Sequence, residues 1–436
     1  MSKTFRRYEP DQMLLMPVAL QEWLPADHLA YFISDVVDQL ELKEILSRYE
    51  GEERGYPPYH PVMMVKVLVY AYCVGVPSSR RIEKRLHEDI AFRVLAANNT
   101  PDFRTISDFR KEHLVALGGL FLKVLELCRQ AGLAKLGHVS LDGTKIKANA
   151  SKHKAMSYGR MREKRARLEA EVEELLKRAQ EVDEEEDQRY GKDRRGDELP
   201  VELAFRESRL KKIREAQEAL EAEAQARGKE VPEDTSQRNF TDPDSRIMPG
   251  PGGKEFHQSY NCHAAVDSAH QVIVAADVTN QPSDHGWALP LVQQIENNTG
   301  SLPKEASADA GYYSTQAVEE LYALGVDPFI PPDKTRHGTV LSPAPQGRIP
   351  GHLSPADRMR RKLRTRRGKR RYALRMGTVE PVFGQIKQAR GFRQFLLRGL
   401  EKVRQEWRLI CAGHNLLKLF ATLRGSRRQQ LAPSVA

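Results

Sequence analysis

The chain is poor in cysteine and has no long uncharged apolar run. Its four cysteines stand singly among 436 residues, without any Cys-x-x-Cys pair, at Cys73, Cys128, Cys262 and Cys411. This spacing argues against a disulfide framework and a cysteine zinc site, so we expect small buried thiols in a reducing compartment. The longest apolar stretch, residues 62–76, is interrupted by Lys66 and is too short to cross a bilayer. Because the N-terminus turns polar and acidic before any apolar run, we expect no secretory signal and an intracellular protein.

Several catalytic signatures are absent as well. No Gly-x-x-x-x-Gly-Lys-Ser/Thr loop occurs, since residues 250–254 lack its spacing and its hydroxyl residue. No Gly-x-Ser-x-Gly elbow occurs, and the 13 histidines include no His-Glu-x-x-His motif. These absences argue against the enzyme classes that the motifs define. A tyrosine recombinase would need dispersed Arg and His residues around a C-terminal Tyr, whereas Tyr372 precedes an acidic motif.

Positive charge is in excess. The 69 Lys and Arg residues outnumber 59 Asp and Glu residues, which gives a net charge of +10 and a pI near 9.3. Such a surface favours a polyanionic partner, and nucleic acid is the first candidate. The length predicts two or three domains, and we place the first at residues 1–135.

The first domain is predicted to be helical. A helix opens at Pro61 and ends before Gly75, and a second helix, residues 80–86, follows a short turn with Ser78 and Ser79 as caps. This is the outline of a helix-turn-helix. Its second helix carries four candidate DNA contacts on or near one face: Arg80, Arg81, Lys84 and Arg85. The alternative is an ordinary helical hairpin with a solvated basic face. One further long helix is expected over residues 105–131.

The rest of the chain predicts a mixed α/β domain over residues 136–425, followed by a tail, residues 426–436. A strand at residues 138–142 ends in Asp142, and a hairpin of strands follows at residues 256–277. A helix, a strand that ends in Asp309, a helix and a last strand at residues 327–331 come next. This order fits a ribonuclease-H-like sheet, in which the ends of the first and fourth strands are neighbours.

A charged insertion interrupts this domain at residues 156–235. Of the 27 positions from Glu163 to Arg189, 17 are charged, and narrow apolar seams run through the segment. We expect a long antiparallel helical hairpin. The acidic run Glu181–Asp187 is best explained as a solvated loop or helix end, because nothing fixes its carboxylates as a metal site.

A loop and a basic arm are expected at residues 333–371, before a helical C-terminal part. Ten of the fourteen residues from Arg358 to Arg371 are basic, and their phosphate-binding candidates are Arg364, Arg366, Arg367 and Arg370. The alternative is a flexible basic linker. Trp287 and Trp407 are expected in the core, with base stacking as the alternative for one of them.

Three acids suggest metal-dependent chemistry on phosphodiesters. Asp142 and Asp309 are predicted at strand ends, and Glu380 lies on a downstream helix. Hard divalent cations prefer carboxylate oxygens, and two such ions can activate an attacking hydroxyl and neutralise a leaving oxygen. Each acid alone is weak support, because an Asp at a strand end is commonly a cap and a helical Glu commonly faces solvent.

The motifs around these acids resemble those of bacterial insertion-sequence DDE transposases. Residues 140–153 (SLDGTKIKANASKH) resemble the first-aspartate motif, residues 308–312 (ADAGY) the second, and residues 379–387 (VEPVFGQIK) the glutamate motif. Tyr372, Arg375, Glu380 and Lys387 approximate the Tyr-Arg-Glu-Lys signature of one branch, but four residues separate Arg375 from Glu380 instead of three. The resemblance, which includes residues 280–284 (NQPSD), extends over about residues 5–425.

The resemblance implies a metal-dependent DNA transposase. Asp142, Asp309 and Glu380 would be catalytic and would hold two Mg²⁺ or Mn²⁺ ions. The helical domain would bind terminal inverted repeats of double-stranded DNA, and the catalytic domain would cleave the element's ends and join them to target DNA. A dimer or higher oligomer on DNA, a bacterial cytoplasmic location at the nucleoid, and no zinc or membrane partner would follow.

The same resemblance suggests further DNA contacts. Lys387 and Arg375 would lie near the scissile phosphate, and Lys145 and Lys147 could meet phosphates from one side of an extended segment. Two alternatives remain at this point. One is a catalytically silent, transposase-derived DNA-binding protein, and the other is a nuclease of the same fold with a structural-maintenance or RNA-processing role.

Overall fold

The computed structural model describes residues 19–50, 57–190, 201–226, 228–250, 255–334, 346–348 and 350–431. The chain forms two compact units, Gly132–Cys411 and Met1–Ala131 together with Ala412–Ala436. We expected the second domain to continue to residue 425, whereas the chain from Ala412 onward belongs with the N-terminal unit. None of the helices in the described residues is long and apolar enough to cross a membrane.

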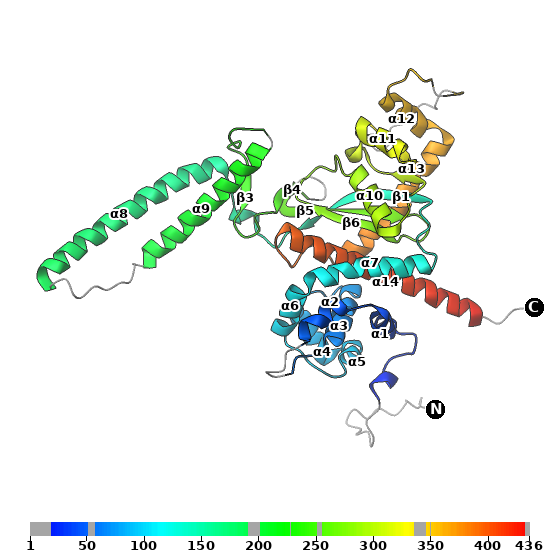
Figure 1. The fold of residues 1–436 in the computed structure, drawn as a ribbon, viewed down its shortest axis with the longest axis horizontal. Coiled ribbons are helices and arrows are strands. Elements are labelled where there is room, and N and C mark those ends of the chain that lie inside the picture. The colour runs from blue at the N-terminus through cyan, green and yellow to red at the C-terminus, as the bar shows by residue number, and fades with distance from the viewer. Residues whose placement is uncertain are drawn as a thin grey trace, which may run out of the picture. The chain divides into compact units, whose positions relative to one another are not determined.

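The described part of the N-terminal unit consists of helices (Figure 1). They are α1 (Leu29–Gln39), α2 (Lys43–Leu46), α3 (Pro61–Cys73), α4 (Ser79–Glu88), α5 (Ile90–Leu95), α6 (Phe103–Glu112), α7 (Leu114–Gln130) and the end of α14 (Leu400–Leu431), with short 3-10 turns at Leu20–Glu22 and Ser47–Tyr49. Helix α3 is buried on nearly every side, which explains why its sequence is apolar all round. Pro61 occupies its first turn, and His60 caps it by accepting a hydrogen bond from the Val62 N–H.

The long helix predicted at residues 105–131 is wrong, because the chain breaks at His113. Its backbone dihedrals, φ −103° and ψ 18°, leave the helical region between α6 and α7. The His113 ring lies 4.6 Å from the Phe109 ring and within 3.0 Å of the Tyr49 hydroxyl. The buried ring therefore takes part in packing at the junction of two shorter helices.

The end of α14 completes the core of this unit. The thiols of Cys73 and Cys128 donate to the carbonyls of Gly413 and Asn415, each at 3.7 Å. All four cysteines of the chain are free and buried, as expected from their spacing. The Phe32 and Phe420 rings lie 5.3 Å apart. Segments from the two ends of the sequence thus share one core.

The second unit contains a mixed sheet. Its strands are β1 (His138–Lys147), β4 (Arg246–Pro249), β5 (Phe256–Asp267), β6 (Ile273–Thr279), β7 (Glu305–Ser307) and β8 (Asp327–Phe329). Strand β5 pairs antiparallel with β1 on one edge and with β4 and β6 on the other. Strand β7 runs parallel to β1, and β8 runs parallel to β7. The predicted mixed α/β class is confirmed, and the strand order is β6-β5-β1-β7-β8 with β4 beside β6 on the edge of β5.

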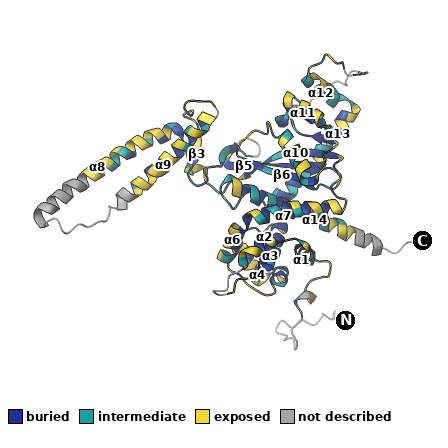
Figure 2. Ribbon diagram, in the orientation of Figure 1, coloured by how far each residue is buried: buried dark blue, intermediate teal, exposed yellow. Residues whose placement is uncertain are grey.

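Helices cover both faces of this sheet, and the strands are mainly dark blue in Figure 2 because they are buried. The helices are α10 (Ala288–Thr299), α11 (Thr315–Ala323), α12 (Pro355–Arg364) and α13 (Arg366–Gly384). Helix α10 packs on β5 and β6, and α13 packs on β1 and β5. Burial on both faces accounts for the continuous Val, Ile and Ala content of β5 and β6.

The insertion contains β2 (Ala155–Ser157), α8 (Tyr158–Tyr190), α9 (Val201–Ala226) and β3 (Gln237–Asn239). Helices α8 and α9 lie side by side in Figure 1 and run antiparallel, since Tyr158 binds Glu221 whereas Glu171 binds Arg206. Their small core includes Met161, Leu168, Leu210, Ile213 and Leu220. The acidic run at residues 181–187 continues α8, but its side chains and the expected break at residues 191–200 lie outside the described residues.

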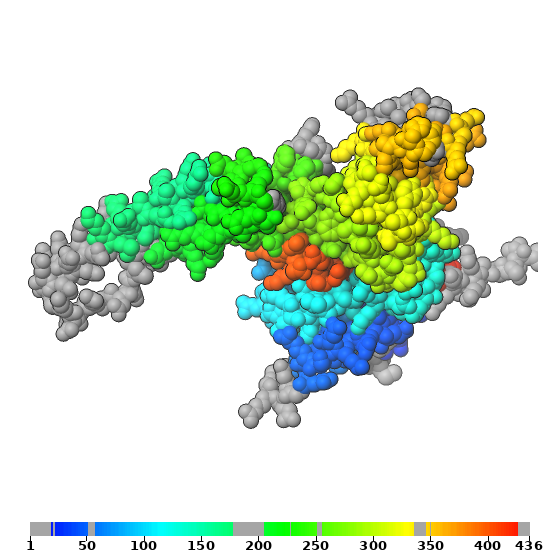
Figure 3. Space-filling view, turned by 45° about the horizontal axis from the view of Figure 1, so that its top comes forward, coloured from blue at the N-terminus to red at the C-terminus, as the bar shows by residue number. Residues whose placement is uncertain are grey.

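The basic arm is helical, which disagrees with the alternative of a flexible basic linker. Residues 358–371 form most of α12 and the start of α13, joined at Thr365, whose hydroxyl caps α13 by accepting from the Gly368 N–H. Of the predicted loop before it, residues 333–357, residues 335–345 and 349 lie outside the described residues, and residues 355–357 already belong to α12. Figure 3 shows α11 and α12 as one continuous surface in yellow and orange.

The C-terminal part is mainly helical, as expected, but it contains two helices, because α13 ends at Gly384 and α14 begins at Leu400. After α13 the chain makes a π-helical turn, Gln385–Ala389, and a non-helical segment precedes α14. Pro381 has no N–H for the Gly377 carbonyl, and the Gln271 side chain donates to that carbonyl instead, at 3.0 Å. Gly391, at φ 77°, then turns the chain back towards β1.

Candidate active site

Two aspartates are brought together where the pairing of β1 with the parallel strand β7 ends. Ser140 pairs with Ser307 in the β1–β7 register, and their hydroxyls lie 3.2 Å apart. Asp142 follows Ser140 by two residues, and Asp309 follows Ser307 by two residues. Because side chains two residues apart lie on the same face of a strand, both aspartates come to the same end of the β1–β7 pair. The prediction that Asp142 ends its strand is wrong, because β1 continues to Lys147 along β5.

Each aspartate is held by the N–H of a nearby glycine. Asp142 Oδ1 accepts from the Gly143 N–H at 2.9 Å. Asp309 Oδ1 accepts from the Gly311 N–H at 2.8 Å and caps the short 3-10 turn Ala310–Tyr312. One oxygen of each carboxylate is thereby fixed by the backbone that follows it.

Arg375 connects the aspartates to the predicted third acid. Its Nη1 lies 2.9 Å from Asp142 Oδ2, and its Nη2 lies 3.5 Å from Glu380 Oε1. The side chains of Arg375 and Asp142 are each 16% exposed, whereas Glu380 is 49% exposed. The structure thus brings the three acids to one region, and Arg375 lies among them.

Burial governs the ionisation of Asp142. It raises the pKa of Asp142 to about 7; the Arg375 cation opposes this, and the negative charges of Asp309 and Asp284 add to it. Burial also raises the pKa of Tyr312 well above its usual range, with Asp284, Asp142 and Asp309 contributing. Carboxylates so close together favour a proton or a cation between them.

The donor atoms suit a hard divalent cation, but the arrangement is not a finished metal site. Carboxylate oxygens are the ligands that Mg²⁺ and Mn²⁺ prefer. In the part of the chain that the structure describes, no group of three or more His, Cys, Asp and Glu side chains is arranged to hold a metal ion. Asp142 Oδ2 faces Arg375, so this guanidinium would have to withdraw from Asp142 for the acids to converge on a cation.

The lysines expected to contact DNA lie in different settings. Lys387, in the π-helical turn, donates to Thr144 Oγ1 at 2.7 Å and to the Lys145 carbonyl at 3.1 Å, and burial lowers its pKa. It therefore fixes β1 close to Asp142. Lys145 and Lys147 fall on the other face of β1 from Asp142, because strand side chains alternate.

The candidate arginines of α12 and α13 divide into two sets. Arg367 Nη2 lies 2.9 Å from Glu305 Oε1, and Arg371 Nε lies 2.9 Å from Glu305 Oε2, which ties α13 to β7. Arg366 and Arg370 are exposed, and no ion pair of theirs occurs among the described residues. Arg364 is half-buried at the end of α12.

The basic face predicted on α4 is exposed in the N-terminal unit. Arg80, Arg81, Lys84 and Arg85 all face solvent, while Ile82 and Leu86 are buried. Arg85 and Lys84 make exposed pairs with Asp89 and Glu88 at 3.4 and 3.7 Å. Such pairs contribute little stability, so these cations remain available to a polyanion.

Sequence reasoning missed Asp284 as a site residue, although it noted residues 280–284. Its carboxylate accepts from the Asn261 side chain at 2.7 Å and lies 4.0 Å from His263 Nδ1. Trp287 stacks on His263 at 4.6 Å, and fully buried Trp407 donates to the His263 carbonyl. Trp407 is thus a core residue, as expected, whereas Trp287 is only partly buried. An acid just beyond a strand was the available signal for Asp284.

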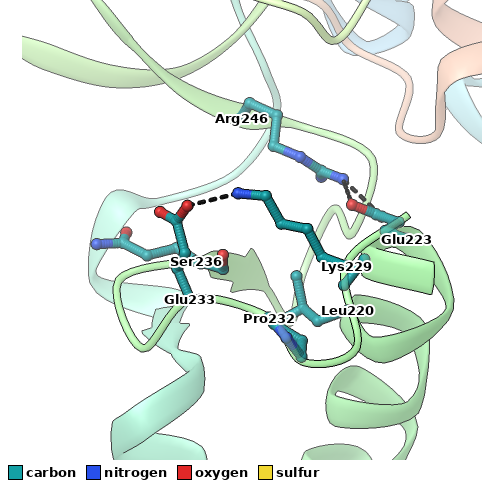
Figure 4. A pocket seen from close by; sticks show the side chains of 9 residues that line it. Leu220, Glu223, Lys229, Pro232, Glu233, Ser236 and Arg246 are labelled. Carbon is teal, nitrogen blue, oxygen red and sulfur yellow. Dashed lines mark hydrogen bonds and ion pairs between the residues drawn. The ribbon is translucent and has the colours of Figure 1, made fainter. Parts of the chain in front are cut away.

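A separate pocket lies beside the insertion (Figure 4). Residues from α9, from the loop before β3 and from β4 line it. Arg246 contacts both oxygens of Glu223 at 2.8 and 3.0 Å, and Lys229 binds Glu233 at 2.7 Å. Its charged groups are thus paired with one another, and it contains none of the predicted site residues.

Two family models match the chain. One, described as Transposase domain (DUF772), matches residues 18–112, and the other, described as Transposase DDE domain, matches residues 348–420. No curated protein and no solved structure matches the chain. The two matched segments are thus similar to transposase domains.

Together they support an insertion-sequence DDE transposase, which confirms the resemblance seen in the motifs. The second match includes Arg375, Glu380 and Lys387, whereas Asp142 and Asp309 lie outside both matched segments.

Proposed function

We propose that this protein binds the terminal inverted repeats of an insertion sequence and catalyses metal-dependent cleavage and strand transfer of its DNA ends. The observation that carries the proposal is the β1–β7 register, which pairs Ser140 with Ser307 two residues before Asp142 and Asp309, beside Arg375 and Glu380 of α13. The strand order β6-β5-β1-β7-β8, with β7 and β8 parallel to β1, supports a ribonuclease-H-like catalytic domain.

The acids supply the chemistry that the reaction needs. Asp142 and Asp309 would hold divalent cations, and Glu380 would join them once Arg375 withdraws. Bound cations activate the attacking hydroxyl and neutralise the leaving oxygen. Gly143 and Gly311 keep one oxygen of each aspartate in place, so the other oxygens are oriented before a cation arrives. Arg375, released from Asp142, is positioned to neutralise a phosphate oxygen.

DNA would be bound by two basic surfaces. The exposed cations of α4 would recognise the inverted repeats, in a helix-turn-helix with α3. Arg366 and Arg370 on α13 would bind phosphates without regard to sequence. Joining two element ends to one target implies a dimer or higher oligomer on DNA, and the bacterial nucleoid would be the place of action.

The test is a cleavage and strand-transfer assay on labelled DNA that carries the repeats flanking the gene. Wild type with Mg²⁺ should nick the repeat ends, and EDTA or Glu380→Gln should abolish nicking without weakening end binding. Glu319→Gln, which removes an exposed acid from α11, is the matched control and should nick normally. Specific binding without nicking by wild type, in Mg²⁺ or Mn²⁺, would instead favour a silent DNA-binding protein.

A further inference from the structure

Both aspartate motifs place a glycine shortly after the acid, and neither glycine is required by backbone conformation. Gly143 and Gly311 are absent from the positive-φ glycines of the described chain. Other residues could therefore adopt their backbone dihedrals, and the reason for glycine must be space.

One carboxylate occupies that space at both positions. A Cβ atom at Gly143 would lie 2.5 Å from Asp284 Oδ1, closer than real Cβ contacts. A Cβ atom at Gly311 would lie 3.3 Å from Asp284 Oδ2 and 3.0 Å from Asp309 Oδ1. Asp284 thus packs against the same two glycines whose N–H groups hold Asp142 and Asp309.

The position of Asp284 is itself fixed. Asn261, on β5, donates to Asp284 Oδ1 at 2.7 Å, and the side chain of Asp284 is only 17% exposed. The backbone carbonyl of Asp284 accepts a hydrogen bond from the N–H of Trp287, at the start of α10. Asp284 therefore joins the sheet and α10 to the backbone beside Asp142 on β1 and to the 3-10 turn that follows Asp309.

We propose that Asp284 is a positioning residue, which acts through Gly143 and Gly311 to orient Asp142 and Asp309 for cation binding. The inference rests on the proposed function for its consequence, but its packing argument depends on contacts within this chain alone. The positioning role depends on the shape of Asp284 and on the hydrogen bond from Asn261. An amide of the same shape should therefore fulfil it, whereas a truncated side chain should not.

The packing is tested by a double-mutant cycle on the metal-free protein. Gly143→Ala should lower the melting temperature, because its methyl meets Asp284 Oδ1. Adding Asp284→Ala should recover part of that loss, since the new methyl then enters the space that the carboxylate left. Gly137→Ala is the matched control, because its Cβ would meet nothing within 4 Å. Strictly additive effects of Gly143→Ala and Asp284→Ala would overturn the inference.

The positioning role is tested by titrating Mn²⁺ and recording its electron paramagnetic resonance spectrum. Asp284→Ala should weaken Mn²⁺ binding by about 10–100-fold, the range for residues that orient metal ligands, and Asp284→Asn should restore most of it. Equal losses in both variants would mean that the charge itself is needed, which contradicts positioning by shape.

The proposed function has its own readout in the same titration. Wild type should bind Mn²⁺, and Asp142→Asn should not. If wild type binds Mn²⁺ and Asp284→Ala binds it equally well, the positioning role is wrong and the transposase proposal stands. Absence of wild-type binding and cleavage would overturn the proposed function, and the positioning role with it, whatever the outcome of the metal-free cycle.

Discussion

At the scale of single residues, the site is an arrangement of like charges held together by one cation. The negative charges of Asp309 and Asp284 raise the pKa of Asp142, and the neighbouring Arg375 cation lowers it. An arginine can neutralise a carboxylate but cannot activate a hydroxyl as a metal does. The protonation of these acids should be measurable through the pH dependence of stability.

The pH dependence of stability follows from Asp142. Its pKa is about 7 in the folded protein against 3.8 for an ordinary aspartate, so the folded state binds more protons between these values. The contribution of Asp142 to the free energy of unfolding should therefore fall as pH rises from about 4 to about 7, by at most roughly 4 kcal/mol. Burial lowers the pKa of His138 and His263, so these two groups contribute in the opposite direction. Denaturant unfolding in EDTA at pH 5 and pH 8 measures the change.

Two variants make that measurement specific. Asp142→Asn should remove this contribution, so its stability should fall less than that of wild type, or rise more, between pH 5 and pH 8. Glu296→Gln, which changes an exposed acid on α10, should leave the pH dependence unchanged. An Asp142→Asn protein whose stability changes as that of wild type does between pH 5 and pH 8 would contradict the assignment of the proton to Asp142.

At the scale of elements, α13 has two roles along its length. Its first turns bind Glu305 on β7 through Arg367 and Arg371, and its later turns carry Arg375 and Glu380. The helix is thus fixed to the sheet at one end and presents its acid at the other. The exposed Arg366, Lys369 and Arg370 face away from the Glu305 contacts and are the residues we expect on DNA.

Neutralising these two sets should give different results. Changing Arg366, Lys369 and Arg370 to Gln should reduce the slope of log affinity against log salt by about 0.9 for each DNA phosphate that is no longer neutralised, with melting unchanged. Changing Arg367 and Arg371 to Gln should lower the melting temperature, because Glu305 is only 9% exposed and would lose both partners. DNA titrations at several salt concentrations and thermal unfolding measure both. An unchanged slope in the first variant would refute the phosphate role.

The sequence predicted helices and strands well where a single hydrophobic period or a single turn motif determines the element. The β5–β6 hairpin, α3, α4 and the helices of the insertion follow from local apolar patterns and turn residues. The breaks at His113 and after Gly384 were missed, because side-chain packing and a π-helical turn interrupt otherwise helical patterns. The three acids came from their motifs, whereas Asp284 requires knowing that residues 143, 284 and 311 meet in space.

At the scale of the whole molecule, the N-terminal unit is built from both ends of the sequence. Cys73, Cys128 and Phe32 all contact the segment that begins at Ala412. Arg424 also pairs with Asp27 at 2.8 Å. Without this segment, several buried apolar surfaces of the unit would face water.

A fragment of residues 1–131 should therefore be unstable alone. It should melt at a lower temperature than the unit does in the full chain, and a peptide of residues 400–431 should raise its melting temperature in a concentration-dependent way. Binding at 100 times the dissociation constant would add about 2.7 kcal/mol. Circular dichroism on heating measures this.

The control is the same peptide with Leu416→Asp and Leu419→Asp, which replaces two buried residues and should not stabilise the fragment. A fragment that melts cooperatively and at the same temperature with or without the peptide would contradict a shared core.

The division of that core between the two ends has a consequence during translation. The first helices leave the ribosome long before residue 412 is made, and at about 5–20 residues per second the interval is tens of seconds. The N-terminal unit must wait for the last helix, although N-terminal domains commonly fold first. If the protein acts as proposed, a nascent chain would be unable to bind its DNA ends until the proposed catalytic domain is also complete. Recognition and cutting would then become available together, and prematurely ended chains would have neither.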